Sequence, residues 1–590
     1  MQVEEPQVRP YAYGVKYVGV IIGLLSSLVY AGTLGFQFVY DDLGQIAENP
    51  ALRSWRFVSQ YFKSDVWAGL DTSSYYYRPL NLLWFRLNYA LFGLNPIGWH
   101  GTSIAVHALA TVLVFRLVER VLADRATAVL AALIFGLHPI HVQSVAWVSG
   151  SADPLVAIFI IAGFLAYLNF RHSGRKRWLA SSLLAYAGAV LTKEPGIVLP
   201  AIIFVYECLQ PTDNTAPRSA YDRVKRAGVA VLPYAAVIIA YFIARIHALR
   251  AFAPASSQIG ILEMILTWPA ILWLYTKHLF LPWEYSLFYD IPPVQRMFSV
   301  QFLVPVGLLL VAVLAIAALS RVLKLPAATI WTAATWFLVP LLPALYLPAV
   351  APEIYGQDRY LYLSTGGFAM LLATLVCRAL PHRSELRSYP KYQIYGTALV
   401  TIILVLCTVI QQQYWRNNVA LFRRAVSIAP HNNQALNNLA VSLAERNDFA
   451  DALPIFDRAI RQNPDSARLD FNYGFTLYRM RQYPDALRFL SRAAEIDSTL
   501  ADAFLYMGMS HLKLGYAQDA ALEVAHAIAL QPHRKGAHLA LGAVLETEGN
   551  IPGAIQETQV ELSNYPGDQM ISNRLNALVQ SESAYRERMP

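Results

Sequence analysis

The sequence has few of the residues that crosslink or charge a soluble domain. It contains three cysteines in 590 residues, and Asp, Glu, Lys and Arg together make up only 15% of the chain. Cys208, Cys377 and Cys407 lie in or beside apolar runs, which indicates small core residues and neither a disulfide framework nor zinc-like spacing. The sequence also has no P-loop, no dinucleotide fingerprint, no Gly-x-Ser-x-Gly elbow and no Cys–His nucleophile pattern. These absences argue against nucleotide-binding enzymes and against serine or cysteine hydrolases.

Apolar residues dominate what is present. They make up 56% of the chain, which is too much for an ordinary soluble protein. Residues 15–412 carry repeated runs long enough to cross a bilayer, whereas residues 413–590 have the pattern of soluble helices. The first run is too long for a signal-peptide core and lacks a cleavage pattern, so we expect a transmembrane helix that also directs targeting. The sequence therefore predicts an all-α protein, with a transmembrane helix bundle of about eleven spans at 1–412 and a soluble domain at 413–590.

Basic connectors predict the orientation in the membrane. The formal net charge is +8, but Lys and Arg gather in the connectors 116–125, 171–177 and 218–226, and no basic, aromatic-interleaved patch indicates nucleic acid. These connectors share one side of the predicted bundle, which the positive-inside rule makes cytoplasmic. The loop 40–97, whose aromatic residues indicate interfacial helices, then lies on the opposite, periplasmic or lumenal side. An odd number of spans places the C-terminal domain on that side as well.

The segment 250–300 is expected to be an outer or interfacial element. It includes Ile261–Leu281, which is apolar enough to span but contains Pro269, Lys277 and His278. If this stretch crossed the bilayer, the later basic connectors would move to the outside. We therefore expect it to lie at the interface or to re-enter rather than to cross.

Prolines in the C-terminal domain recur in phase. Pro430, Pro464, Pro532 and Pro566 share one register with a period of about 34 residues, the length of a tetratricopeptide repeat. Such an α-solenoid presents a concave groove that suits an extended polypeptide. The register predicts a half-repeat at 413–432, complete repeats at 433–466, 467–500, 501–534 and 535–568, and a capping helix at 569–585.

Two adjacent carboxylates, Asp41 and Asp42, follow the first predicted span. Either they mark the membrane boundary and cap the next helix, or one of them is a general base at the mouth of a membrane-embedded site. His138 and His141 could share a helix face and bind a metal, but Pro139 interrupts regular helix between them, and satisfied histidines at an interface are commoner. The sequence therefore indicates no definite cofactor, and a divalent metal is not favoured.

Cations lie on the same predicted face. Lys193 and Glu194 interrupt an apolar stretch, either as an ion pair at a tight turn or with Lys193 contacting a phosphate and Glu194 orienting an acceptor or a metal. Arg78 and Arg359 suit planar recognition of phosphate, or else they anchor the chain at the interface. A carboxylate base beside cations in a membrane suits displacement of a lipid-linked phosphate from a sugar by an acceptor hydroxyl. The predicted substrate-binding residues are Arg78, His138, His141, Lys193, Glu194 and Arg359.

The order of these motifs resembles that of a known family. The motifs are, in order, Asp41-Asp42, Tyr77-Arg78-Pro79-Leu80, His138 to Val142 with Ser149 to Asp153, Lys193-Glu194, and Asp358 to Tyr362. Together with the repeats, they make the chain resemble the transmembrane and tetratricopeptide-repeat protein O-mannosyltransferases and their bacterial relatives, which are C-type glycosyltransferases.

The resemblance implies a specific activity. Mannose would pass from a polyprenyl-phosphate donor to Ser or Thr hydroxyls of a polypeptide on the non-cytoplasmic face, within a lipid membrane. Asp41 would be the base with Asp42 in support, while Arg78 and Arg359 would contact the donor phosphate. The chain has few repeats where animal members have many, which favours a bacterial inner-membrane protein over one of the endoplasmic reticulum.

Two other functions stay open from the residues themselves. The protein could be a non-enzymatic, membrane-anchored repeat scaffold for the assembly of envelope proteins, or a transporter of lipid-linked sugars. A scaffold would not need the carboxylate of Asp41, whereas a glycosyltransferase would.

Overall fold

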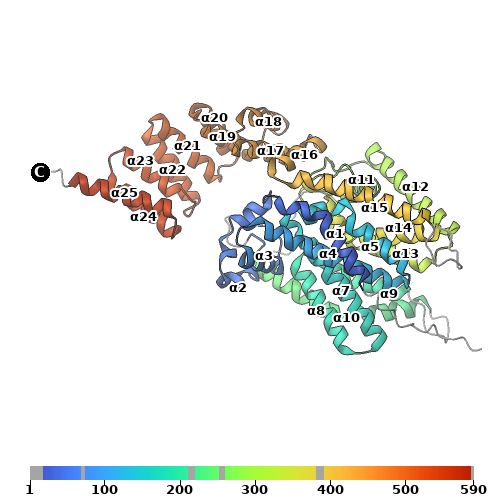
Figure 1. Cartoon of the computed structure of the whole chain (residues 1–590). Helices are drawn as coiled ribbons and strands as arrows, with labels where there is room; N and C mark the ends of the chain where they lie inside the picture. Colours follow the sequence, from blue (N-terminus) through green and yellow to red (C-terminus); the bar gives the residue numbers. More distant parts are fainter. Residues whose placement is uncertain (1–16, 68–73, 210–218, 251–258, 380–390, 587–590) are drawn as a thin grey trace, which may run out of the picture. The chain divides into compact units, whose positions relative to one another are not determined.

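The computed structural model describes residues 17–67, 74–209, 219–250, 259–379 and 391–586 (Figure 1). Within these residues the chain forms helices joined by turns and contains no β-strand, so the all-α prediction is confirmed. The chain divides into two compact units, Met1–Ile428 and Ala429–Pro590, which we call the membrane unit and the repeat unit.

Short helical turns join the α-helices of the membrane unit. The α-helices are α1 (Val18–Tyr30), α2 (Val58–Tyr61), α3 (Pro79–Phe92), α4 (Pro96–Leu122), α5 (Arg125–Leu137), α6 (Val142–Ala146), α7 (Ala152–Ser173), α8 (Lys176–Thr192), α9 (Leu199–Leu209), α10 (Ala220–Leu249), α11 (Ile261–Phe280), α12 (Val300–Val322), α13 (Ala327–Leu338), α14 (Thr365–Ala379), α15 (Lys391–Gln412) and α16 (Asn418–Ile428).

Local sequence signals set the ends of α4 and α5. The Asn95 side chain accepts a hydrogen bond from the Ile97 N–H, and Pro96 occupies the first turn, where the missing N–H costs nothing. Ala123 ends α4 in the left-handed region, and the Asp124 side chain then caps α5. The connector is therefore only two residues long, and it makes α4 and α5 packed neighbours in the core.

Seven helical segments among the described residues are long and apolar enough to cross a membrane. They are Val18–Gly35, Pro96–Leu122, Val148–Ser173, Ala220–Leu249, Val300–Val322, Ala327–Leu345 and Ala398–Trp415. A bent pair, Arg125–Leu137 with Pro139–Ala146, makes an eighth if it counts as one span. The chain is a multi-pass membrane protein.

The sequence prediction of about eleven spans included helices that are short for a straight crossing. α8 has 17 residues, α9 has 11 and α14 has 15, whereas a bilayer needs about 20. α11, the stretch that we expected not to cross, is not among the candidate spans. Apolar runs continue past the points where helices stop, so hydropathy alone counts a short helix and a full span alike.

The exposure of α12 shows why these helices need lipid. Only 6% of its most apolar window is buried within the protein. Leu310, Val311 and Leu314 are each more than half exposed. A helix that is apolar on all sides and uncovered by protein is stable only when lipid tails surround it.

α7 carries polar groups of different kinds at its two ends. Asp153 lies in its first turn and Arg171 in its last turn, roughly 27 Å apart at 1.5 Å per residue. At the second end, Arg171 Nε lies 2.7 Å from Glu207 Oε1, and Arg226 Nε lies 3.3 Å from Glu207 Oε2. Two of the basic connectors therefore share the end of the unit opposite to Asp153. Which end faces the cytoplasm stays a prediction from the loop charges.

The repeat unit is a stack of helix pairs, which confirms the predicted α-solenoid. The buried alanines lie where the paired helices cross: a Cβ on Gly474 would lie 3.1 Å from the Ala486 carbonyl oxygen, and one on Gly508 would lie 2.9 Å from that of Ala520. The helices are α17 (Asn433–Glu445), α18 (Phe449–Gln462), α19 (Ala467–Arg479), α20 (Tyr483–Ile496), α21 (Ala501–Leu514), α22 (Ala517–Leu530), α23 (Ala537–Thr547), α24 (Ile551–Asn564) and the trailing α25 (Gln569–Arg586).

The boundary between the two compact units lies at 428/429, whereas the change in hydropathy places a domain boundary at 412/413. The predicted half-repeat, 413–432, therefore does not fall within one unit. Its helix, α16, packs with the membrane unit.

Candidate active site

Asp42 is a fixed carboxylate. It is fully buried, and its Oδ1 accepts hydrogen bonds from the Ser149 backbone N–H at 2.7 Å and from the Ser149 hydroxyl at 2.6 Å. Its Oδ2 accepts from the Val39 N–H at 3.2 Å. Burial raises the pKa of Asp42 to about 7, although these hydrogen bonds act in the opposite direction. Asp42 thus ties the turn after the first span to the turn that precedes α7.

Asp41 differs from its neighbour in having no such ties. Among the described residues, no group donates a hydrogen bond to the Asp41 carboxylate. Burial raises the pKa of Asp41 to about 6, while the positive charges of Arg359 and Arg78 oppose the rise. An ionised carboxylate with free lone pairs beside two cations can accept a proton from a substrate.

The residue before Asp41 has an unusual backbone. Tyr40 has a φ of 54°, in the left-handed region, which costs a residue with a side chain about 1–2 kcal/mol. Its N–H donates to Asn418 Oδ1 at 2.8 Å, and its ring packs against those of Trp147, Phe288 and Phe422. Tertiary contacts therefore hold this conformation.

Two of the predicted cations are paired with acids. Arg78, just before α3, binds Glu194 through Nε at 3.0 Å and Nη2 at 2.6 Å. Lys193, just after α8, forms a buried ion pair with Asp153. Burial lowers the pKa of Lys193 to about 8, with Asp153 opposing the fall. The acids of the site thus occupy Arg78 and Lys193.

Arg359 is the predicted cation that has no acid partner within ion-pairing distance among the described residues. Its guanidinium carbon lies 4.9 Å from the centre of the Trp147 ring and 5.6 Å from that of Tyr360. Its backbone N–H donates to Gln143 Oε1 at 3.0 Å, and its buried Nε has no hydrogen-bond partner. A planar cation held against aromatic rings, with donors to spare, suits an anionic ligand.

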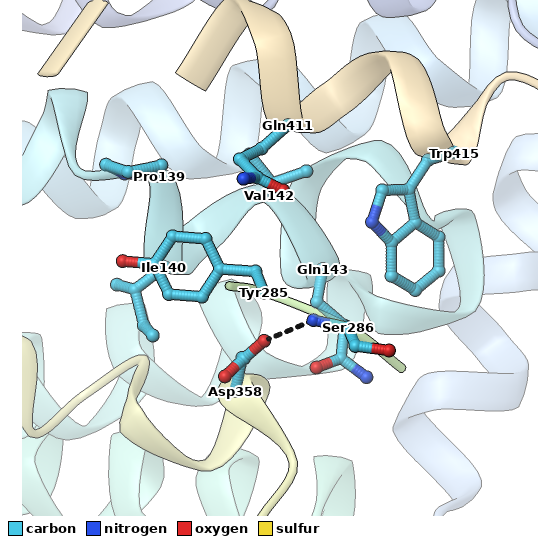
Figure 2. Close-up of a pocket in the computed structure, with 9 residues that line it drawn as sticks. All are labelled: Pro139, Ile140, Val142, Gln143, Tyr285, Ser286, Asp358, Gln411 and Trp415. Carbon is cyan, nitrogen blue, oxygen red and sulfur yellow. Dashed lines mark hydrogen bonds between the residues drawn. The ribbon is translucent and has the colours of Figure 1, made fainter. Parts of the chain in front are cut away.

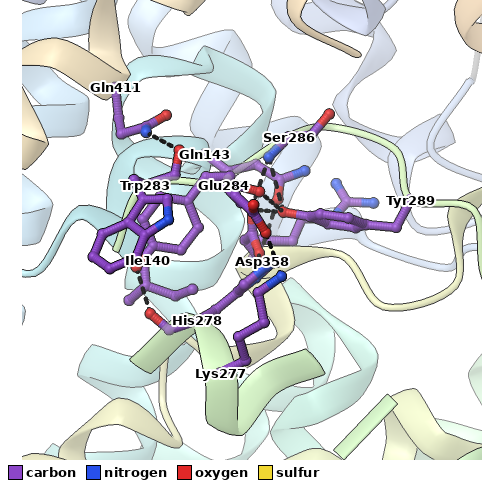
Figure 3. Close-up of polar contacts among 12 residues, drawn as sticks. Ile140, Gln143, Lys277, His278, Trp283, Glu284, Ser286, Tyr289, Asp358 and Gln411 are labelled. Atoms are coloured by element: carbon purple, nitrogen blue, oxygen red, sulfur yellow. Dashed lines mark hydrogen bonds and ion pairs between the residues drawn. The ribbon is translucent and has the colours of Figure 1, made fainter. Parts of the chain in front are cut away.

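The residue before Arg359 is held by a polar network (Figure 3). Asp358 accepts from the Tyr289 hydroxyl at 2.6 Å and from the Ser286 N–H at 3.3 Å, and it lies 2.9 Å from His278 Nδ1. The network joins the end of α11 and the segment after it to the turn that carries Arg359. The 250–300 segment predicted at the outer face thus contributes directly to the candidate site.

A small pocket lies beside Asp358 (Figure 2). Segments that are far apart in sequence meet there: the turn before α6 and the start of α6, the segment after α11, the turn at Asp358, and the end of α15 with the turn that follows it. The lining residues are Pro139, Ile140, Val142, Gln143, Tyr285, Ser286, Asp358, Gln411 and Trp415.

The two predicted histidines lie in the packed interior. His138 accepts from the Ile140 N–H through Nδ1 at 3.2 Å, and its Nε2 lies 3.1 Å from the Leu279 carbonyl oxygen. His141 is buried against the rings of Phe135 and Tyr362. Within the described residues, no group of three or more His, Cys, Asp or Glu side chains is placed to hold a metal ion.

Several site residues were not predicted. Ser149 and Asp153 lie within a motif that we noted, but hydropathy gave no reason to pair them with Asp42 and Lys193. Trp147 lies among apolar residues, and nothing in the pattern marked it as the support of a cation. Their roles depend on contacts between distant parts of the chain.

The sequence is similar to family models and to known proteins over both units. The family model for dolichyl-phosphate-mannose-protein mannosyltransferase matches residues 78–221, and tetratricopeptide-repeat models match 443–504 and 505–569. The chain is similar to the transmembrane and tetratricopeptide-repeat protein O-mannosyltransferases. Protein O-mannosyl-transferase TMTC3 of Homo sapiens is 25% identical over 511 residues, which cover 80% of this chain and 54% of that protein. Protein O-mannosyl-transferase TMTC4 of Mus musculus is 28% identical over 495 residues, which cover 74% of this chain and 65% of that protein.

The chain spans between about half and two thirds of the length of these O-mannosyltransferases. A shorter match, to protein O-mannosyl-transferase TMTC1 of Mus musculus, is 34% identical over 206 residues, which cover 32% of this chain and 21% of that protein. Among solved structures, a thermophilic TPR protein of Thermus thermophilus aligns with 32% of this chain and 96% of its own, at 19% identity and a TM-score of 0.26.

Proposed function

We propose that this protein is an integral membrane glycosyltransferase that transfers mannose from a polyprenyl-phosphate donor to Ser or Thr hydroxyls of protein acceptors. One observation carries the proposal most: the Asp41 carboxylate, free of hydrogen bonds from the described residues, interacts electrostatically with Arg359, a cation without an acid partner among those residues. The relationship to the O-mannosyltransferases supports the same reaction class.

The reaction needs a base and a site for the departing phosphate. The acceptor hydroxyl oxygen forms a bond to the anomeric carbon as the bond from that carbon to the phosphate oxygen breaks. Asp41 takes the hydroxyl proton, and the polyprenyl phosphate leaves with the bonding electron pair. Arg359 stabilises the charge that grows on the phosphate. With a pKa of about 6, Asp41 is mostly ionised at neutral pH.

The paired cations contribute in a different way. Because Glu194 occupies the guanidinium of Arg78, and Asp153 occupies Lys193, these pairs raise the local positive potential less than free cations would. We assign Arg78 and Glu194 to the wall that receives the phosphate and the acceptor, with Lys193 behind them. His138 and His141 are buried in the packed interior, so we assign them to the support of this wall and not to direct contact with the donor.

The repeats recruit the acceptor in this proposal. A groove across α17, α19 and α21 contains the aromatic side chains Phe471, Phe475 and Tyr506. Beside them, Asn472 Nδ2 donates to Asn437 Oδ1 at 2.7 Å. Aromatic rings that bind apolar side chains, next to amides that bind a peptide backbone, suit an extended polypeptide. Both the groove and Asp41 then lie on the non-cytoplasmic side, in a bacterial inner membrane or in the endoplasmic reticulum.

The direct test is transfer by the purified full-length protein in lipid nanodiscs. A Ser/Thr-containing peptide is incubated with polyprenyl-phosphate mannose, and in parallel with the glucose and galactose donors, and its intact mass is measured. We expect one added hexose with the mannose donor. A peptide that stays unmodified with every donor would overturn the proposal and favour a scaffold or a transporter of lipid-linked sugars. Independently, a reporter that is active only outside the cytoplasm and is fused after Pro590 should be active.

A further inference from the structure

α16 makes contacts that a repeat helix would not need. Its residues touch two separate parts of the candidate site, the turn that carries Asp41 and the segment that follows α11. All of these contacts lie within the membrane unit. The sequence describes α16 only as half of a repeat, so none of these contacts is expected from the pattern.

The first contact is to Tyr40. Asn418, the first residue of α16, accepts the Tyr40 N–H at 2.8 Å, and the Phe422 ring packs edge-on against the Tyr40 ring with 5.8 Å between their centres. Tyr40 has a positive φ although it does not follow a helix. In the described part of the chain, the other such residues apart from glycine each come directly, or within two residues, after the end of an α-helix: Ala123, Arg250, Lys324, Asn447 and Arg481. A bulky residue keeps this backbone only where its surroundings over-determine it.

The second set of contacts reaches the Arg359 side. Trp415, just before α16, stacks on Trp147 with 6.0 Å between ring centres and 24° between planes. Trp147 is also the ring that the Arg359 guanidinium packs against. In addition, Arg424 donates to the carbonyl oxygens of Trp283 at 2.6 Å and Tyr285 at 3.1 Å.

These carbonyls belong to the segment that holds Asp358. The next residue, Ser286, donates its N–H to the Asp358 carboxylate (Figures 2 and 3). One short stretch of chain, 415–424, thus braces both the residue before Asp41 and the residue before Arg359. Ordinary helix packing would explain the aromatic contacts. It would not explain why the Asn418 side chain accepts a hydrogen bond from the Tyr40 backbone N–H.

We propose that residues 415–424 are a positioning element that holds the carboxylate of Asp41 and the guanidinium of Arg359 in register, with Asn418, Phe422 and Arg424 as positioning residues. The inference rests on the proposed function for its kinetic consequence. Its structural consequence, an ordered turn at Tyr40, does not depend on any activity.

The kinetic test uses Asn418→Ala in the full-length protein, with Arg423→Ala as a matched control because Arg423 is on the same helix and exposed. We expect kcat of Asn418→Ala to fall at least tenfold while KM for the donor stays within twofold, because the donor-binding groups remain. Asn418→Asp keeps an acceptor oxygen and should retain at least a third of kcat. A rise in donor KM without a fall in kcat, or an equal fall in Arg423→Ala, would overturn the proposal.

Hydrogen exchange provides a readout that does not need transferase activity. The Tyr40 amide should exchange at least tenfold faster in Asn418→Ala than in wild type, and at the wild-type rate in Arg423→Ala. Unchanged exchange in Asn418→Ala would overturn the proposal even if transfer is never observed. If Asn418→Ala does not fold, Arg424→Ala replaces it, with faster exchange expected over 283–289 and contradiction if that segment is unchanged.

Discussion

Arg78 and Glu194 form a two-point ion pair across 116 residues of sequence, with Nη2 to Oε2 at 2.6 Å and Nε to Oε2 at 3.0 Å. The pair links the start of α3 to the turn after α8. It joins the loop that follows the turn at Asp41 and Asp42 to the rest of the candidate site.

This pair makes a prediction about stability. Its side chains are 16% and 28% exposed, so its contribution falls between those of surface and buried pairs, at about 2 kcal/mol. Arg78→Gln and Glu194→Gln should each destabilise the protein, and the double variant should lose much less than the sum. A double-mutant cycle on unfolding in detergent measures this coupling. Strictly additive losses would show that the pair contributes nothing.

Arg359 should act through both its charge and its shape. Arg359→Lys keeps the charge but loses the planar contact with Trp147, so we expect kcat/KM to fall about 10–100-fold. Arg359→Gln loses the charge as well and should fall by about 1000-fold. The same measurement on Arg321→Ala, an exposed arginine at the end of α12, is the control. Equal activity in the Lys and Gln variants would contradict a phosphate contact.

The pH profile of transfer should report the raised pKa of Asp41. A base works only when ionised, so kcat/KM should fall about tenfold per pH unit below the pKa. Because burial raises that pKa to about 6, activity should decline below about pH 6 rather than below the usual value near 4. The pKa of Asp42 is raised to about 7, and the two neighbouring carboxylates affect each other's titration. The acidic limb of the pH profile therefore reports the pair and not Asp41 alone. A profile that declines only near pH 4 would contradict a general base whose pKa is raised by burial.

The repeat groove should affect the acceptor alone. Phe475→Ala removes an aromatic side chain from the groove, and we expect KM for the peptide to rise about tenfold, as for a truncated contact at a binding hot spot. Hydrolysis of the donor without peptide should be unchanged. Arg468→Ala, on the same helix but outside the groove lining, is the control. A fall in donor hydrolysis in Phe475→Ala would contradict a role confined to recruitment.

The sequence was sufficient for the architecture, because periodic signals are local. The proline register predicted the helix pairs of the repeat unit, and the apolar runs predicted the membrane bundle. The number of spans was harder to predict from hydropathy, because an apolar run does not show where the helices α8, α9 and α14 end. The helix ends there depend on breaks such as the one at Lys193.

The sequence indicated candidate site residues one by one, but it did not indicate how they are arranged. Nothing in the sequence indicates that Arg78 pairs with Glu194, that Lys193 pairs with Asp153, or that Arg359 is left without an acid among the residues that the structure describes. These pairings depend on how α3, α7 and α8 pack, and packing is decided by contacts over long separations. The contacts of α16 were likewise not predictable from the sequence. Its pattern is that of a repeat helix and gives no sign that it contacts Tyr40, the residue before Asp41.

The most direct test of the account is the activity of Asp41→Asn in the purified protein, with Asp451→Asn, an exposed residue of the repeats, as the matched control. Transfer of mannose from polyprenyl-phosphate mannose to a Ser/Thr peptide is measured under saturating donor. We predict that kcat of Asp41→Asn falls about 1000-fold, as for loss of a general base, while donor binding stays within threefold and the control is unaffected. A variant that keeps more than a tenth of the wild-type kcat would contradict the assignment of Asp41 as the base.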